Sequence, residues 1–155
     1  MAISKIESSG LGTGAVLQVI NASTTTITAA TSTTYVDTTL TATITPKFST
    51  SKILVLISAN GTYKSASNTA ILLRLQRNGS TISNIEGFAA YTGLIDVNAV
   101  GSIAFTYLDS PASTSAQAYK VQIASSGNAA TARINEYAAS AGDSVSTITL
   151  MEIAG

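Results

Sequence analysis

The sequence contains no cysteine, no histidine and no tryptophan. Without cysteine there is no disulfide framework and no thiol nucleophile. Without histidine the chain lacks the usual general base and the most common metal ligand. Tryptophan is the side chain that stacks best on sugars, so its absence weighs against carbohydrate binding. We therefore expect a protein that is not an enzyme and that has no cofactor and no metal site.

Charge is also scarce. Charged residues make up 10% of the 155 residues, and eight basic side chains balance eight acidic ones. An ordinary soluble domain has about 25%. A neutral chain offers no basic patch for nucleic acid, and no apolar run approaches the ~20 residues of a membrane helix. A surface with so few charges is poorly protected against association. We therefore expect copies of the chain, or a larger assembly, to cover much of it.

The strongest apolar run lies within Ser51–Tyr63, where Ile53, Leu54, Val55, Leu56 and Ile57 follow one another without a break. The run is too short to indicate a helix, is rich in β-branched residues and is flanked by turn formers. This pattern predicts a strand buried on both faces. On that interpretation, Leu54→Asp or Leu56→Asp prevents folding, because an unpaired charge is not tolerated in a core.

Alternating apolar and polar residues predict further strands on both sides of this run, and no segment indicates a helix. Pro46 ends one of them, and Asn78-Gly79 is a strong hairpin signal. The segment 87–98 is predicted to be a long loop with a short strand or helical turn, and the Thr/Ser tract 21–34 an exposed or edge strand. The other predicted strands cover residues 15–20, 35–45, 70–77, 80–86, 100–108, 117–124, 132–137 and 145–153.

Eight or nine strands with turn signals every ten or so residues predict an all-β, single-domain antiparallel β-sandwich of the jelly-roll kind. Residues 15–155 form this domain, and residues 1–14 are predicted to be a flexible arm or docking segment. Ile53–Ile57 and Ile148–Ile153 carry apolar residues on both faces, so we expect them side by side at the centre. Besides the run described above, the predicted core contains Leu73, Leu75, Phe105, Val121, Ile123, Ile148 and Leu150.

No group of residues has the spacing of a catalytic or metal motif. The eight acidic residues are scattered, and none lies in a known metal-binding or metalloprotease pattern. Asp109 is interpreted as a turn cap. Glu152 in the last strand is predicted to lie near the rim or to pair with a cation such as Arg74 or Arg133. The six tyrosines could form a sugar-binding platform, but packing with the hydroxyl at the rim is the simpler interpretation.

Several segments resemble a group of small β-rich virion proteins of tailed bacteriophages, of the tail-fibre or capsid-decoration type found in phages of cyanobacteria and marine bacteria. The likeness covers nearly the whole chain from Gly14 onward and departs from the group at Ala15, where a lysine is expected. It lies in Gly14-Ala-Val-Leu-Gln-Val-Ile20, Thr33-Thr-Tyr-Val-Asp-Thr-Thr-Leu-Thr-Ala-Thr-Ile-Thr-Pro46, Ser51-Lys-Ile-Leu-Val-Leu-Ile-Ser58, Leu75-Gln-Arg-Asn-Gly-Ser80, Phe105-Thr-Tyr-Leu-Asp-Ser-Pro111 and Val145-Ser-Thr-Ile-Thr-Leu-Met-Glu-Ile153.

The resemblance implies a non-enzymatic sandwich, trimeric, on the surface of a phage particle and made in the host cytoplasm. Two roles are compatible with it. In one, the protein is a decoration or cement protein that clamps neighbouring subunits of the major capsid protein. In the other, it is a tail-fibre or receptor-binding knob that contacts the host surface. A lectin-like carbohydrate-binding module is a further alternative, from a different class of function.

Overall fold

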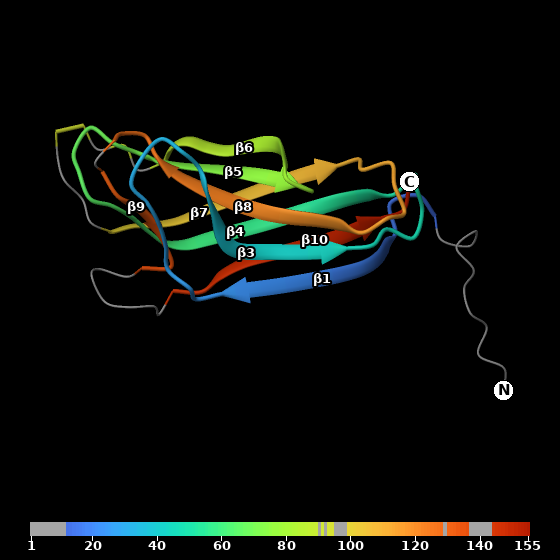
Figure 1. Cartoon of the computed structure of the whole chain (residues 1–155). Coiled ribbons are helices and arrows are strands. Elements are labelled where there is room, and N and C mark those ends of the chain that lie inside the picture. Colours follow the sequence, from blue (N-terminus) through green and yellow to red (C-terminus); the bar gives the residue numbers. More distant parts are fainter. Residues whose placement is uncertain (1–11, 90, 92, 95–98, 129, 137–143) are drawn as a thin grey trace.

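The computed structural model describes residues 12–89, 91, 93–94, 99–128, 130–136 and 144–155, which form ten β-strands and no helix (Figure 1). The strands are β1 (Val16–Thr24), β2 (Thr28–Ala30), β3 (Val36–Ile44), β4 (Lys52–Lys64), β5 (Ile71–Arg77), β6 (Ser80–Ala89), β7 (Ala99–Asp109), β8 (Gln117–Ser125), β9 (Ala132–Ile134) and β10 (Ser146–Ile153). The all-β prediction is confirmed.

The strands pair like one long hairpin that has been rolled up. β1 pairs with β10, β3 with β8, β4 with β7, and β5 with β6, all antiparallel. This nesting of first with last, working inward to the central β5–β6 hairpin, is the jelly-roll topology. At the innermost turn Asn78 and Gly79 have φ values of +50° and +83°. Both lie in the left-handed region that a two-residue hairpin turn requires, so the hairpin prediction is confirmed.

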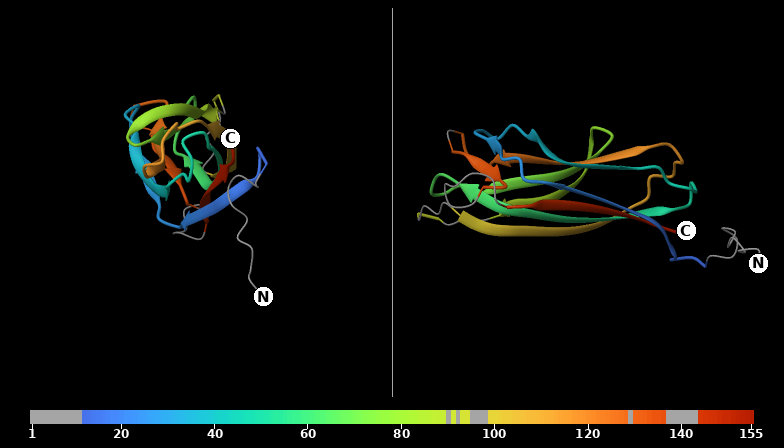
Figure 2. Two further views of the ribbon diagram at one scale, coloured as in Figure 1. Left: turned by 90° about the vertical axis from the view of Figure 1, so that its right-hand side faces the viewer. Right: turned by 90° about the horizontal axis from the view of Figure 1, so that it is seen from below.

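The rolled hairpin forms two layers, which Figure 2 shows end-on and from below. One sheet has the order β1-β10-β4-β9-β2, with β7 on the other side of β4; the second sheet has the order β3-β8-β5-β6. The last strand, β10, lies between β1 and β4 and pairs with β4 from Thr147 to Ile153. The two doubly apolar segments are therefore side by side, as the sequence predicts.

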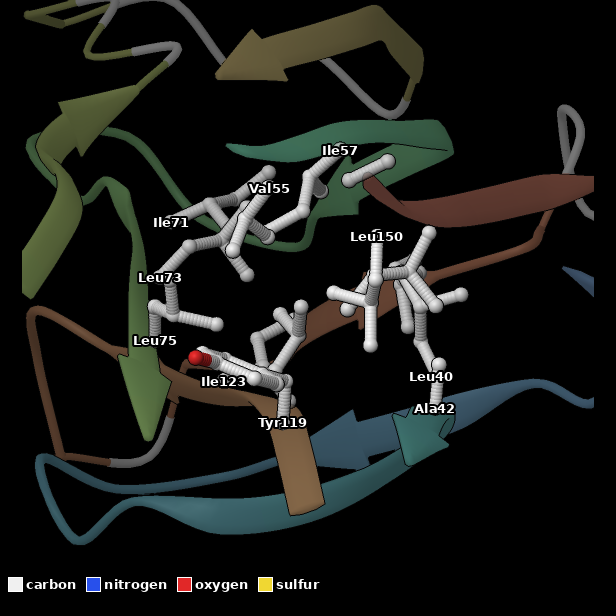
Figure 3. Close-up of a cluster of buried hydrophobic side chains, with 14 of the residues drawn as sticks. Leu40, Ala42, Val55, Ile57, Ile71, Leu73, Leu75, Tyr119, Ile123 and Leu150 are labelled. Atoms are coloured by element: carbon white, nitrogen blue, oxygen red, sulfur yellow. The ribbon is translucent and has the colours of Figure 1, made fainter. Parts of the chain in front are cut away.

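Side chains from both sheets meet between the layers and form one core (Figure 3). Alternation places Leu40, Ala42 and Ile44 of β3 inward while their neighbours face solvent. Each fully buried aliphatic side chain contributes about 1.5–3 kcal/mol. Among the predicted core residues, the structure buries Ile53, Val55, Ile57, Leu73, Leu75, Val121, Ile123, Ile148 and Leu150, and it packs the partly buried Phe105 against them.

The expectation that the Ile53–Ile57 run is buried on both faces is wrong within the described chain. Ile53, Val55 and Ile57 point into the core, whereas Leu54 and Leu56 are half-buried on the outward face. No described segment forms a third layer over that face. An uninterrupted apolar run indicates which side chains avoid water, but it does not indicate whether the same chain covers both faces of the strand.

Several strand boundaries also differ from the prediction, and the strand expected over residues 132–137 ends at Ile134. The apolar run is followed by Asn60-Gly61, which as turn formers predict the end of its strand. β4 instead continues to Lys64, with a shift in its register against β7 between Ala59 and Thr62. Gly61 has φ +57°, so the glycine forms a bulge within the strand rather than a turn. The tract 21–34 is divided between the end of β1 and the short β2, and β6 continues to Ala89 where a loop was expected. Residues 95–98 of that loop lie outside the described residues.

Candidate assembly surface

The outward face of strands β1, β10, β4 and β7 carries a row of large apolar side chains. Val19 lies beside Met151, Met151 beside Leu54, and Leu54 beside Leu108, through the registers of the three strand pairs. Val19 is 54% exposed and Leu108 50% exposed, with Met151 and Leu54 half-buried between them. We call these four residues the apolar ridge. Aligned apolar side chains of this size on a solvent-facing sheet are typical of an interaction surface.

Toward the other end of the strands the same face becomes polar but stays uncharged. The next two rows are formed by Asn21, Thr149, Leu56 and Thr106, and by Ser23, Thr147, Ser58 and Ala104. Asn21 Nδ2 donates a hydrogen bond to Thr149 Oγ1 across the strands at 2.7 Å. Because small side chains adjoin Leu56, the face is hollowed here by about 250 Å³. We call this depression the threonine hollow; it is lined by Leu56, Ile57, Ser58, Ala104, Phe105, Thr106, Thr147 and Thr149.

Neither the ridge nor the two rows of the hollow contain an acidic or basic residue. On the outward side of these strands the nearest charged residue in the registers is Lys52, paired with Ile153 at the ridge end; Glu152 and Asp109, next to the ridge in sequence, are buried. The outer face of the second sheet is different, because Lys120 Nζ contacts Asp37 Oδ2 at 2.6 Å and Arg74 Nε donates to Gln122 at 2.6 Å. The hydrogen bond from Lys120 lowers the pKa of Asp37. The outer face of the second sheet therefore carries charged side chains, whereas the ridge and the hollow on the outer face of the first sheet carry none.

A buried polar cluster joins the two sheets at one end of the sandwich. Asp109, the last residue of β7, accepts hydrogen bonds at Oδ2 from Arg77 Nη1 at 2.6 Å and from the Tyr119 hydroxyl at 2.7 Å. Its Oδ1 accepts from the backbone amide of Ser110 at 2.9 Å, as expected of a turn cap. Burial, reinforced by the Asp109 carboxylate, raises the pKa of Tyr119 well above its usual value. The cluster keeps Tyr119 protonated as a donor, so its role is to fix the sheets together.

The sequence predicts that Glu152 lies near the rim or pairs with a cation such as Arg74 or Arg133. In the structure it does neither. It is fully buried, and its carboxylate accepts hydrogen bonds from Gln18 Nε2 at 2.5 Å and from the backbone amide of Lys47 at 2.7 Å. Burial alone would raise its pKa, but these donors outweigh burial and leave the pKa below its ordinary value. The carboxylate thus attaches the turn after β3 to β1 and β10.

Arg133 donates two hydrogen bonds, of 2.6 and 2.7 Å, to the carboxylate of Glu136. Its guanidinium lies 5.2 Å from the ring centroid of Tyr63. Glu136 lines a hollow of about 240 Å³ with Asn60, Gly61, Thr62, Gly101, Ser102 and Ser144. This hollow contains one carboxylate, already neutralised by arginine. Among the described residues no group of three or more potential metal ligands occurs.

The tyrosines do not form a shared platform in the described part of the chain. Tyr119 is buried. The guanidinium carbon of Arg74 lies over the ring of Tyr35, 4.0 Å from the ring centroid. Tyr107 stacks on Phe105 with the ring centroids 6.2 Å apart. Tyr91 is 53% exposed in the loop after β6. Tyr137 lies outside the described residues, as does Asp143.

No family model matches the chain, and no curated protein matches it. Among solved structures, the chain is similar to the crystal structure of the VP2 subviral particle of infectious bursal disease virus, with 12% identity and a TM-score of 0.48. It is also similar to the structure of the Gt strain of that virus, with 12% identity and a TM-score of 0.40. All of this chain is covered, but only 42% and 43% of the two others. The jelly-roll assignment rests on the strand pairing given above and not on this likeness.

A search of the described residues for a helix long and apolar enough to cross a membrane finds none.

Proposed function

We propose that the chain is a non-enzymatic structural protein on the surface of a virus particle, of the tailed-bacteriophage type, and that it acts as a trimeric decoration protein of the capsid. The observation that supports this most is the uncharged apolar ridge and threonine hollow on the outward face of β1, β10, β4 and β7. A face with four aligned apolar side chains and no charged group along the ridge and the hollow is suited to burial against protein.

The remaining features agree with a structural role. Jelly rolls occur in viral capsid and lectin domains, and the fold alone does not choose between them. The polar clusters of the described chain are saturated by internal partners: Asp109 by Arg77 and Tyr119, and Glu152 by Gln18 and Lys47. Groups satisfied in this way stabilise a subunit, whereas a catalytic group must be available to a substrate.

Assembly would also protect the edges of the sheets. β7 is a long strand whose side away from β4 has no partner among the described strands, and β6 is an edge of the second sheet. Unpaired edges recruit stray strands unless something covers them. A standard interface removes roughly 1,600 Å² of surface from water, so three interfaces in a trimer and further contacts with capsid subunits would cover much of this charge-poor chain.

One observation favours the alternative role, a fibre or receptor-binding knob. The amide of Gly14 donates to the carbonyl of Ala154, and the amide of Ala154 donates to Ala15, so the two ends of the described domain lie side by side (Figure 1). A knob attached to a shaft through this end would present the opposite end of the sandwich to a host.

The copy number per particle separates the two roles. Quantitative mass spectrometry of purified particles that carry the protein should find hundreds of copies for a decoration protein and tens for a knob. Particles without the protein should lose their contents at a lower temperature if it is a decoration protein, whereas purified protein should block adsorption if it is a knob. Purified particles that lack the chain altogether would refute both roles.

A further inference from the structure

We propose that the apolar ridge of one copy packs into the threonine hollow of a second copy, so that this sheet face is the contact between subunits. The inference rests on the self-association in the proposed function and specifies its site. Ridge and hollow are different parts of one face, separated along the strands. When the second copy does not return the same contact to the first, the interface is heterologous, and three copies close into a ring when the rotation between them permits it.

The absence of charge on the face favours a second copy as its occupant. A partner with charged groups at this position would lose their hydration and gain no counter-charge, because the ridge and the hollow contain no acid or base. Unpaired desolvated charges are costly. A second copy brings an equally neutral face, so its burial requires neither ion pairing nor charge desolvation and involves no repulsion between like charges.

The face is an extended plane that two neighbouring copies can share. It spans four strands and about eight residues along each of them. Strands lie ~4.8 Å apart and rise ~3.3 Å per residue, which gives a plane of roughly 500 Å² before the relief of the side chains is added. One partner in a standard interface contributes about 800 Å². In a ring the ridge and the hollow contact different neighbours, so each contact uses roughly half of this plane, and side-chain relief and the surrounding loops supply the rest of a standard interface.

The shape of the face is suited to a copy of itself. Leu108 and Val19 stand half-exposed on the ridge, while Ser58 and Ala104 leave the hollow of about 250 Å³ beside Leu56. A raised apolar row and a depression with a partly apolar lining, on the same molecule, can interdigitate between copies. Polar contacts are available at the rim, where Thr106, Thr147 and Thr149 bring hydroxyl groups.

The natural absence of cysteine allows a direct test. Leu108→Cys places a thiol on the ridge and Ala104→Cys places one in the hollow, both at exposed positions on the outward side of β7. Within one chain these positions are four strand residues apart, or ~13 Å, beyond the ~7 Å that a disulfide can span. Under mild oxidation, a mixture of the two single variants should give covalent dimers, and the double variant should give dimers and trimers. Each single variant alone should stay mostly uncrosslinked.

The matched control is the pair Thr39→Cys and Thr43→Cys. These residues have the same spacing on one strand, β3, and are exposed on the outer face of the other sheet. Cross-linking of the control pair to the same extent would show random collision and would overturn the inference. A wild-type protein that sediments as a trimer while the Leu108/Ala104 pair does not cross-link would also overturn it, yet would leave self-association intact. A single-chain mass at every concentration would refute self-association itself.

Discussion

Gly61 lies within β4 at φ +57°, in a place where no other residue fits. A Cβ atom there would lie 2.6 Å from the Ser144 side chain and 2.8 Å from the carbonyl oxygen of Glu136. Gly79 is also in the left-handed region, at φ +83°, but open space surrounds its missing Cβ. Substitutions at Gly79 and Gly61 therefore separate two losses of stability: the cost of a left-handed backbone conformation at both sites, and the cost of close contacts at Gly61 alone.

We expect Gly79→Ala to lower the free energy of unfolding by about 1–2 kcal/mol, the ordinary cost of a left-handed alanine. Gly61→Ala should cost at least twice as much, because backbone and side-chain atoms must also move. Urea unfolding followed by circular dichroism measures both variants. Equal losses for the two would mean that Gly61 is not packed as described.

Glu152 makes a second prediction at the level of a single residue. Because hydrogen bonds lower its folded pKa below the ordinary value of 4.5, its contribution to stability is complete above that pH and is lost as the pH falls through the folded pKa. Glu152→Gln should lower the free energy of unfolding at pH 7 by about 1–3 kcal/mol. The difference from the wild type should shrink on acidification.

Denaturant unfolding at several pH values between 3 and 7 measures this dependence. Asp37→Asn is the control, because its ion pair with Lys120 is largely exposed and exposed pairs contribute about 0–1 kcal/mol. A Glu152→Gln difference that is constant with pH would contradict the assigned role of the carboxylate.

At the level of elements, the Asp109 cluster connects β7 of one sheet to β5 and β8 of the other. Tyr119→Phe removes one of the hydrogen bonds to Asp109 and should cost about 0.5–1.5 kcal/mol. Arg77→Met removes the second hydrogen bond to the same Oδ2 atom. In a double-mutant cycle the two changes should not be additive, because both donors serve the same Oδ2 atom. Strict additivity of the two losses would show that the donors act independently.

The alternation along β4 gives the sharpest prediction for an element. Val55 is fully buried, whereas its neighbour Leu56 is half-buried on the outward face. Val55→Asp should abolish the folded β signal, because it places an unpaired charge in the core. Leu56→Asp should keep that signal and lose self-association. The expectation from sequence, that Leu54→Asp and Leu56→Asp prevent folding, is thus revised. A Leu56→Asp chain that does not fold would restore the earlier interpretation.

Much of the fold follows from local chemistry. The period-two pattern of β3, its end at Ile44 shortly before Pro46 and the Asn78-Gly79 hairpin are all set by neighbouring residues. The bulge at Gly61 is not set by neighbouring residues, because glycine is required there by Ser144 and Glu136, which are distant in sequence. The partners of Glu152 were missed for the same reason, since Gln18 and Lys47 meet it only after β1 and β10 have paired.

The apolar residues of the assembly surface are visible in the sequence, but their pattern fits burial within one chain as well as burial between chains. Apolar residues on both faces of β4 and β10 suggested burial within one chain, and the structure places Leu54 and Met151 on an outward face instead. Periodicity identifies a face that avoids water. Whether the cover comes from the same chain or from another depends on the number of layers, which local patterns do not encode.

For the whole molecule, the two outer faces of the sandwich differ. One bears the Lys120–Asp37 pair and Arg74, and the other bears the apolar ridge and the threonine hollow. A subunit of this design can bury its neutral face against further copies and keep its charged face in water. With little charge elsewhere on the chain, the exposed neutral face would make a lone subunit prone to unspecific association.

Sedimentation equilibrium of the wild-type protein over a hundredfold range of concentration tests the central claim most directly. The account predicts a mass of three 15.7 kDa chains that persists at micromolar concentration and falls to the mass of one folded chain in Leu56→Asp. A wild-type protein that stays at the mass of one chain throughout the range, folded and soluble, would contradict it.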